Sequence, residues 1–167
     1  MGQNRKFGRT FHKLFLLCLI LALLFAAGCS FVKESGKESG KGGMYIYYTN
    51  MEGTSLDKVE YTTTNSTEEN AVVDMLYMMR KEPESIENKS VFPSGVYVRD
   101  WVLTDEILDI HFSSGYGRMK PEEEVLLRAA VVLTLSQLKG IEYIDFFIED
   151  EQLTDSMGNV IGYMGAE

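Results

Sequence analysis

Residues able to carry acid–base or nucleophilic chemistry are few in this 167-residue chain. Asp109 and His111 are two positions apart, so on a strand their side chains would share one face, where a carboxylate can orient an imidazole base. The following Ser113-Ser114-Gly115 lacks the Gly-x-Ser-x-Gly pattern that presents a serine nucleophile. We therefore interpret His111 as a structural residue and Ser113 as the start of a loop, and we expect no enzyme activity.

Clustered carboxylates suggest a second kind of chemistry, cation binding. Glu122-Glu123-Glu124 follows a proline at the start of a predicted helix, where carboxylates stabilise the positive end of the helix dipole. Glu149-Asp150-Glu151, with Asp155, lacks the fixed spacing of a calcium loop and fits a solvated acidic edge. Gly115-Tyr116-Gly117 lacks the later glycine and lysine of a phosphate loop. We expect neither a metal nor a cofactor.

Charge and composition exclude several classes of protein. The chain has 16 Lys and Arg against 25 Asp and Glu, a formal net charge of −9, and so lacks the basic surface that nucleic-acid binding requires. Two Cys and two His are too few for a disulfide-rich scaffold, a zinc ribbon or an iron–sulfur protein. An apolar fraction of 45%, with nine Phe and nine Tyr, predicts a packed core.

Residues 1–28 have the features of a bacterial lipoprotein signal peptide. Four basic residues and no acidic residue accompany an apolar run over residues 14–27, which is shorter than the ~20 residues of a membrane-spanning helix. Ala26-Ala27-Gly28-Cys29 then resembles the lipobox, in which Cys29 receives a diacylglycerol thioether before cleavage. The alternatives are an uncleaved anchor, or ordinary cleavage near Ala27 that leaves a free thiol.

The rest of the chain divides into a tether and one domain. Residues 29–43 hold Cys29 and a Gly/Ser/Lys/Glu-rich segment, whose composition predicts a flexible linker with a reach of roughly 20 Å. Residues 44–167 carry the apolar periodicity of a single folded domain. Because the four N-terminal basic residues belong to the signal peptide, the remainder has 12 basic and 25 acidic residues, a net charge of −13. We expect an acidic extracytoplasmic domain, anchored by lipid to the cell membrane.

Apolar periodicity predicts the order of elements in the domain. Strands are expected over residues 44–49, 56–63, 95–103, 107–112 and 143–148, with the third and fourth forming a hairpin. Helices are expected over residues 67–81, where Ser66 and Glu69 form a capping box, and 121–138, which is apolar nearly all round and therefore buried. The resulting α+β fold has one mixed β-sheet, in β(β)-α-β-β-α-β order, with both helices packed on one face.

Six segments spread through nearly the whole domain carry a family likeness. They are Tyr45-Ile-Tyr-Tyr48, the helix at residues 68–79 with its Leu76, Phe92-Pro-Ser-Gly-Val96, residues 108–113, Val132-Leu-Thr-Leu135, and the tail at residues 155–158 and 162–164. Their order and spacing resemble those of GerM-domain lipoproteins, the sporulation and spore germination family of Gram-positive bacteria. The resemblance implies a fold similar to the ring-building motifs of secretion machines, and a binding or assembly module rather than an enzyme.

The expected one-faced sheet would leave Tyr97, Arg99 and Trp101 on or near its open face, with Tyr143 and Phe147. Aromatic and arginine side chains anchor protein interfaces, so the first three are the candidate partner-binding residues. We expect a membrane-anchored, non-catalytic interaction or assembly module of sporulation, germination or envelope machinery, which binds an envelope protein or associates with itself. The alternative is an envelope lipoprotein that binds a cell-wall glycan, a peptide or a cation.

Overall fold

The computed structural model describes residues 43–62, 67–155 and 157–166. The expected signal peptide at residues 1–28, the lipidation site Cys29, the linker up to residue 42 and the capping residue Ser66 lie outside the described residues. Residues Gly43–Glu167 form one structural unit of the chain. Among the described residues, no helix has both the length and the apolar character needed to cross a membrane.

The first sheet contains strands β1 (Met44–Asn50), β2 (Leu56–Tyr61) and β3 (Asn88–Lys89), in the order β2-β1-β3. Both pairings are antiparallel. Strand β1 is rich in aromatic and β-branched residues, which favour extended backbone. Its turn into β2 is closed by the Asn50 side chain, whose Oδ1 accepts a hydrogen bond from the Thr54 amide at 2.8 Å.

The second sheet contains strands β4 (Val98–Thr104), β5 (Ile107–Phe112), β6 (Tyr143–Ile148) and β7 (Glu151–Gln152), in that order. Strands β4 and β5 form the predicted antiparallel hairpin, and β5 and β6 pair in parallel. The long helix between β5 and β6 provides the crossover that a parallel pair requires. Inward-facing Leu108, Ile110 and Phe112 of β5 are fully buried.

Helix α2 (Glu68–Arg80) begins one residue after, and ends one residue before, the predicted bounds. Its N-cap is Thr67, whose hydroxyl accepts a hydrogen bond from the Asn70 amide at 3.3 Å. Helix α3 (Pro121–Leu135) follows a short 3₁₀ helix, η1 (Tyr116–Arg118), and ends three residues before the predicted Leu138. The chain turns there and reaches Gly140, whose φ of +87° suits glycine.

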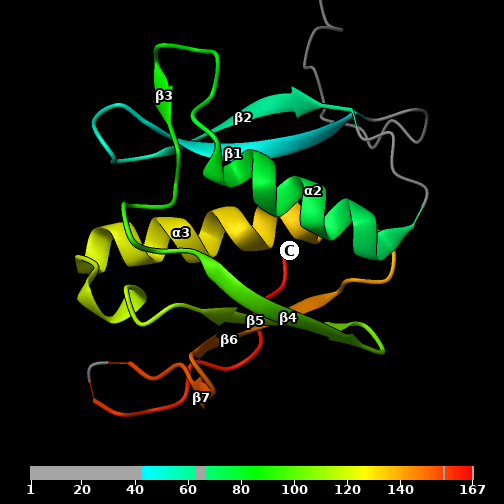
Figure 1. The fold of residues 1–167 in the computed structure, drawn as a ribbon, viewed down its shortest axis with the longest axis vertical. Helices are drawn as coiled ribbons and strands as arrows, with labels where there is room; N and C mark the ends of the chain where they lie inside the picture. The colour runs from blue at the N-terminus through cyan, green and yellow to red at the C-terminus, as the bar shows by residue number, and fades with distance from the viewer. Residues whose placement is uncertain (1–42, 63–66, 156, 167) are drawn as a thin grey trace, which may run out of the picture. The chain divides into compact units, whose positions relative to one another are not determined.

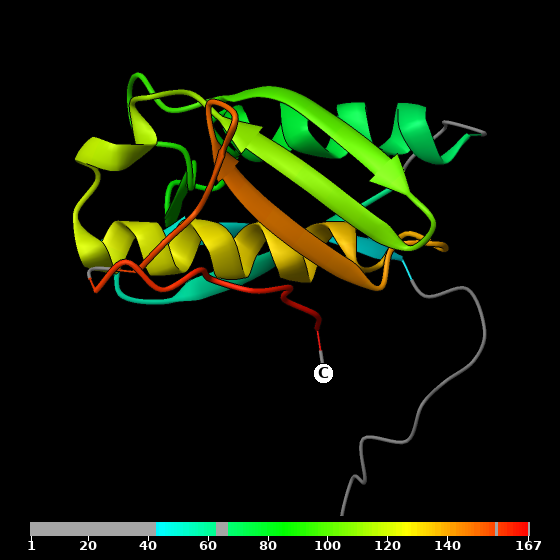
Figure 2. The same cartoon turned by 90° about the horizontal axis from the view of Figure 1, so that it is seen from below.

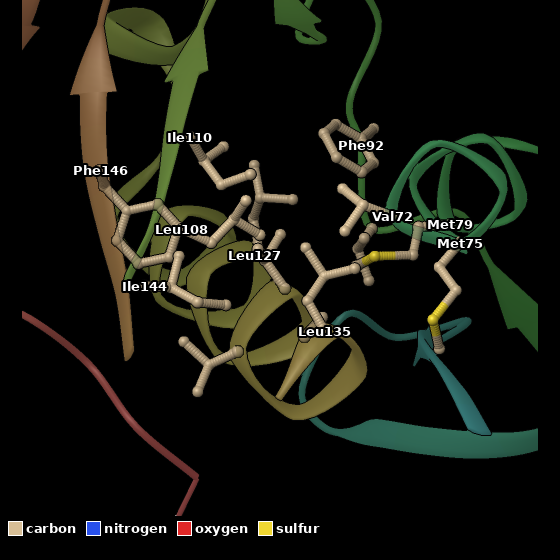
Figure 3. Close-up of a cluster of buried hydrophobic side chains, with 14 of the residues drawn as sticks. Val72, Met75, Met79, Phe92, Leu108, Ile110, Leu127, Leu135, Ile144 and Phe146 are labelled. Carbon is tan, nitrogen blue, oxygen red and sulfur yellow. The ribbon is translucent and has the colours of Figure 1, made fainter. Parts of the chain in front are cut away.

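The two helices lie between the two sheets, as Figures 1 and 2 show from perpendicular directions. Helix α3 contacts β1, and its apolar residues also pack toward β5 and β6. Figure 3 shows Leu127 and Leu135 of α3 between Ile144 and Phe146 on one side and Met75 and Met79 of α2 on the other. Burial of α3 on most sides confirms what its apolar sequence predicts, since Leu127, Ala130, Val131 and Leu135 are fully buried.

The α+β class and the order of the main elements are confirmed, but the strands divide between two sheets instead of forming one. The reason lies on the side of β1 that faces away from β2, where β3 pairs with Thr49 and Asn50 and leaves the residues before them without a strand partner. There Gln137 Oε1 accepts from the Tyr45 amide and Gln137 Nε2 donates to the Tyr45 carbonyl, both at 2.8 Å, and Thr134 Oγ1 accepts from the Tyr47 amide at 3.2 Å. Side chains of α3 and its C-terminal turn thus occupy backbone groups that another strand would need.

Candidate functional site

A bulge in β4 separates the three predicted partner-binding residues. The β4–β5 register passes from Val98 opposite Phe112 to Asp100 opposite His111, so Arg99 is the extra residue. Strict alternation would place Tyr97, Arg99 and Trp101 on one face, but the bulge shifts it by one position. Trp101 consequently pairs with buried Ile110 and lies on the helix side of the sheet, so its expected place on the open face is wrong.

Arg99 is held toward the end of β6. Its Nη1 lies 2.8 Å from Glu149 Oε2, and the other oxygen of that carboxylate accepts from the Ser114 amide at 2.8 Å. About two fifths of the Arg99 side chain is exposed, so this ion pair is screened by solvent and contributes little stability. Its main effect is to fix the direction of the guanidinium.

Trp101 lines a groove between α2 and β4, the edge strand of its sheet. The groove has a volume of about 300 Å³. Four of its lining residues come from α2, one from the loop before β4 and four from β4: Val73, Leu76, Tyr77 and Arg80; Phe92; and Val98, Arg99, Asp100 and Trp101.

Several apolar side chains at this groove face solvent. Val73 is 55% exposed and Tyr77 is 64% exposed, so both present apolar surface to solvent at the groove. Tyr97 is 41% exposed, and its ring lies under the Arg80 guanidinium at 5.5 Å from the ring centroid. Trp101, the only tryptophan of the chain, is half-buried. The groove therefore combines the tryptophan, tyrosine and arginine side chains that dominate binding energy in protein interfaces.

The free edge of β4 is partly blocked against strand addition. The two-residue turn at Asp105-Glu106 makes Thr104 and Ile107 a hydrogen-bonded pair, and along β4 every second residue then bonds to β5. Trp101 is three positions before Thr104, so its amide points away from β5, to the free edge. That amide donates to Asp100 Oδ1 at 2.8 Å. Together with the bulge at Arg99, this internal bond leaves side chains as the main binding groups of the groove.

Sequence reasoning missed the contribution of α2. Val73, Tyr77 and Arg80 recur at spacings of four and three, which places them on one stripe of the helix. The core stripe of the same helix is Val72, Met75 and Met79, all fully buried. Large apolar residues outside the core stripe were the sequence signal for the groove.

The residues considered for acid–base chemistry have structural partners. His111 stacks on Phe147, with ring centroids 4.6 Å apart, and its Nδ1 lies 2.8 Å from the Glu149 carbonyl oxygen. Ser113 is buried; its hydroxyl donates to the Gly95 carbonyl at 3.1 Å and accepts from the Tyr97 amide at 3.3 Å. These bonds join the segment before β4 to the end of β5.

Carboxylates on the open face of the second sheet lie close together. Asp109 and Asp145 are neighbours on parallel strands, and Asp145 is buried and accepts from Gln152 Nε2 at 2.8 Å. Partial burial raises the pKa of Asp109, the Asp145 charge raises it further, and His111 opposes both. The pair penalises the ionised form of Asp109 in the folded state.

The other acidic clusters serve local structure. Glu124, in the first turn of α3, pairs with Arg128 at 3.5 Å and accepts from the Tyr116 hydroxyl at 3.2 Å. Burial, followed by the Glu124 charge, raises the pKa of Tyr116. Asp155 accepts bonds from the side chain and backbone of Asn159, which lower its pKa and fix a turn. In the described part of the chain, no grouping of His, Cys, Asp and Glu side chains could hold a metal ion.

Two helices lie between an antiparallel and a mixed sheet, and an apolar, arginine-bearing groove lies at one edge of this α+β domain. The family model of Germane, described as sporulation and spore germination, matches residues 45–154. The chain belongs to this family, as its resemblance to GerM-domain proteins predicts. No curated protein matches the sequence.

Solved structures support the same fold. The tandem GerMN domains of the sporulation protein GerM from Bacillus subtilis match with a TM-score of 0.57 at 17% identity, over 72% of this chain and 44% of that chain. The first GerMN domain of the same protein matches with a TM-score of 0.54 at 17% identity, over 72% of this chain and 94% of that domain. The chain thus spans less than half of the tandem structure but nearly all of one GerMN domain.

Proposed function

We propose that this chain is a lipid-anchored, extracytoplasmic lipoprotein whose single domain binds a protein of the sporulation, germination or envelope machinery without catalysis. Membership of the sporulation and spore germination family supports the cellular setting. The groove between α2 and β4 carries the binding proposal, because it exposes Val73 and Tyr77 beside Trp101 and Arg80. Arg99 extends the same surface toward the open face of the sheet.

The anchor and the tether determine where the domain acts. In this proposal residues 1–28 are removed, Cys29 carries the lipid, residues 30–43 span the distance to the membrane, and residues 44–167 bind the partner. Stable anchoring needs two or more acyl chains, which a lipidated cysteine provides. Cys29→Ser should move the protein from the membrane fraction to the soluble or unprocessed pool. Unchanged membrane retention of a processed Cys29→Ser protein would contradict lipid anchoring.

The binding surface can be tested by photocrosslinking in cells, in growing and in sporulating cultures. A benzoylphenylalanine at position 77 reports on the groove, and the same residue at position 163 is a matched control. Tyr77 and Tyr163 are the same residue type and are 64% and 61% exposed, but only Tyr77 lines the groove, whereas Tyr163 lines a separate hollow beside the C-terminal tail. We expect a discrete crosslinked protein from position 77 and none from position 163. Equal crosslinking from both positions, or none from position 77, would contradict a partner at this groove.

One observation favours the alternative function, binding of a cell-wall glycan or peptide. A second hollow lies beside the C-terminal tail, and its lining includes Tyr143, Tyr163 and Ser136. Ser136 Oγ is buried and has no hydrogen-bond partner within the described residues. A saturable thermal shift with soluble muropeptides, abolished by Tyr163→Ala, would support this alternative over the groove.

A further inference from the structure

We infer that the groove between α2 and β4 takes a partner segment in which an apolar side chain stands beside a carboxylate. The apolar side chain would contact Tyr77 and Trp101, and the carboxylate would pair with Arg80. This inference rests on the proposed function and specifies the chemistry of the partner. It follows from exposure, from charge and from the state of the β4 edge.

The apolar part of the inference comes from the lining of the groove. Val73 and Tyr77 are more than half exposed, and Leu76, Phe92, Val98 and Trp101 complete the apolar lining. Burying an aliphatic or aromatic side chain of a partner against such a surface removes apolar area from water and therefore favours binding. Rigid aromatic groups add to this because they lose little conformational entropy on binding.

The acidic part comes from Arg80. Within the described residues, the ion pairs are Arg99 with Glu149 and Arg128 with Glu124, so Arg80 pairs with no described carboxylate. Its guanidinium lies over the ring of Tyr97. Asp100, on the opposite wall, has one oxygen bonded to the Trp101 amide. The chain after residue 28 carries a net charge of −13, so an unpaired arginine in an apolar groove is a local exception that complements an acidic ligand.

The β4 edge determines how the segment docks. A peptide that added as a strand would use the amides on the free edge of β4, but the bulge at Arg99 interrupts the ladder and the Trp101 amide is already bonded. Recognition therefore depends on side chains in the groove. The competing possibilities are a second copy of the chain in the groove and a peptide that adds to β4 as a strand.

Trp101 allows a direct test, because it is the only tryptophan and lines the groove. The full chain, in detergent micelles, is titrated with a nine-residue peptide of repeated Glu-Leu-Glu while tryptophan emission is recorded. A peptide of repeated Lys-Leu-Lys is the control for charge. We expect saturable quenching or a blue shift with the acidic peptide and none with the basic one.

The matched variants are Arg80→Glu and Lys81→Glu. Both reverse a cation at the C-terminal end of α2, and so disturb the helix dipole equally, but only Arg80 lines the groove. We expect Arg80→Glu to weaken binding of the acidic peptide about tenfold or more, and Lys81→Glu to leave it within about twofold. Denaturant unfolding of both variants shows whether they retain the native fold.

Three outcomes would overturn the inference. The first is equal binding of the acidic and the basic peptide, or equal binding of the acidic peptide by Arg80→Glu and Lys81→Glu. The second is binding that is lost when the peptide backbone is N-methylated but does not change with peptide charge, which indicates strand addition. The third is concentration-dependent self-association of the wild type that Arg80→Glu abolishes, which indicates a second copy. Crosslinking from position 77 without binding of the acidic peptide would refute the acidic segment but leave the proposed protein partner standing. Binding of the acidic peptide without crosslinking from position 77 would refute the protein partner proposed for this groove.

Discussion

The two sheets differ in how the backbone hydrogen-bonding groups along β1 and along β4 find partners. Strand β1 has an edge beside α3, where the amide of Tyr45, its carbonyl and the amide of Tyr47 all bond to the side chains of Gln137 and Thr134. Strand β4 has an edge beside α2, where the Trp101 amide bonds only to its neighbour Asp100. One edge is closed by another element of the fold, and the other is left beside an open groove.

The difference depends on which side chains each helix presents. An amide such as Gln137 both accepts and donates, and so replaces the backbone of an adjacent strand. Helix α2 presents Val73, Leu76 and Tyr77 toward β4. Valine and leucine have no hydrogen-bonding groups, and among the described residues no bond joins the Tyr77 hydroxyl to β4. Hydrogen bonds that close an edge stabilise the fold, whereas an open edge beside exposed apolar side chains favours association with another chain. The contrast supports the assignment of function to the β4 side of the domain.

The largest expected effect is from breaking the closed edge. Gln137→Leu keeps the volume but leaves the amide and carbonyl of Tyr45 without partners, which should lower the free energy of unfolding by about 2–3 kcal/mol. Thr134→Val is the matched variant: it removes one acceptor, that of the Tyr47 amide, and should cost about 1 kcal/mol. Denaturant unfolding measures both. If Gln137→Leu lost less than Thr134→Val, closure of this edge would not explain the arrangement.

Local elements of the fold were predictable from the sequence because they depend on nearby residues. Both long helices, the hairpin of β4 and β5, and strand β6 follow from periodicity and from turn residues. The division into two sheets did not follow, because it depends on bonds between residues about 90 positions apart, such as Tyr45 with Gln137. The two-residue strands β3 and β7 are too short to carry a periodic signal.

The candidate site was only half predictable for a related reason. Tyr97, Arg99 and Trp101 were selected from their residue types, and Trp101 does line a groove. A bulge has no reliable sequence signal, so the face that each residue occupies could not be known. The other wall of the groove comes from α2, and its contribution appears only once α2 is placed beside β4.

The next prediction concerns the free edge of β4, where Asp100 accepts a hydrogen bond from the Trp101 amide. Asp100→Ala frees the Trp101 amide on the edge of β4, so two copies can pair through this strand. We expect a dimer fraction that rises with concentration in sedimentation velocity, at concentrations where the wild type shows several-fold less. Asp100→Asn keeps an oxygen acceptor for the amide and should behave as the wild type does. If Asp100→Asn and Asp100→Ala dimerised equally, loss of charge and not the freed amide would be responsible.

A third prediction concerns the open face of the same sheet, where Asp109 adjoins Asp145. Because the pKa of Asp109 is raised in the folded protein, the folded state binds a proton more readily than the unfolded state does. Ionisation of Asp109 therefore destabilises the fold above its raised pKa, and this penalty disappears below about pH 4, the ordinary range of an aspartate. Asp109→Asn should raise the thermal midpoint at pH 7 and lose this gain as pH falls. A lower midpoint at pH 7 would contradict a net penalty.

The smallest effect is expected at the turn that sets the register of β4. Asp105 has a φ of +56°, a conformation that suits glycine, so Asp105→Gly should raise the free energy of unfolding by about 0.5 kcal/mol. Glu106→Gly is the matched control, because Glu106 does not have a positive φ and glycine there should destabilise by a similar amount. Thermal unfolding distinguishes the two signs. Opposite signs would show that the positive φ at Asp105, in the turn that sets which amides of β4 face the free edge, is a strained conformation for aspartate.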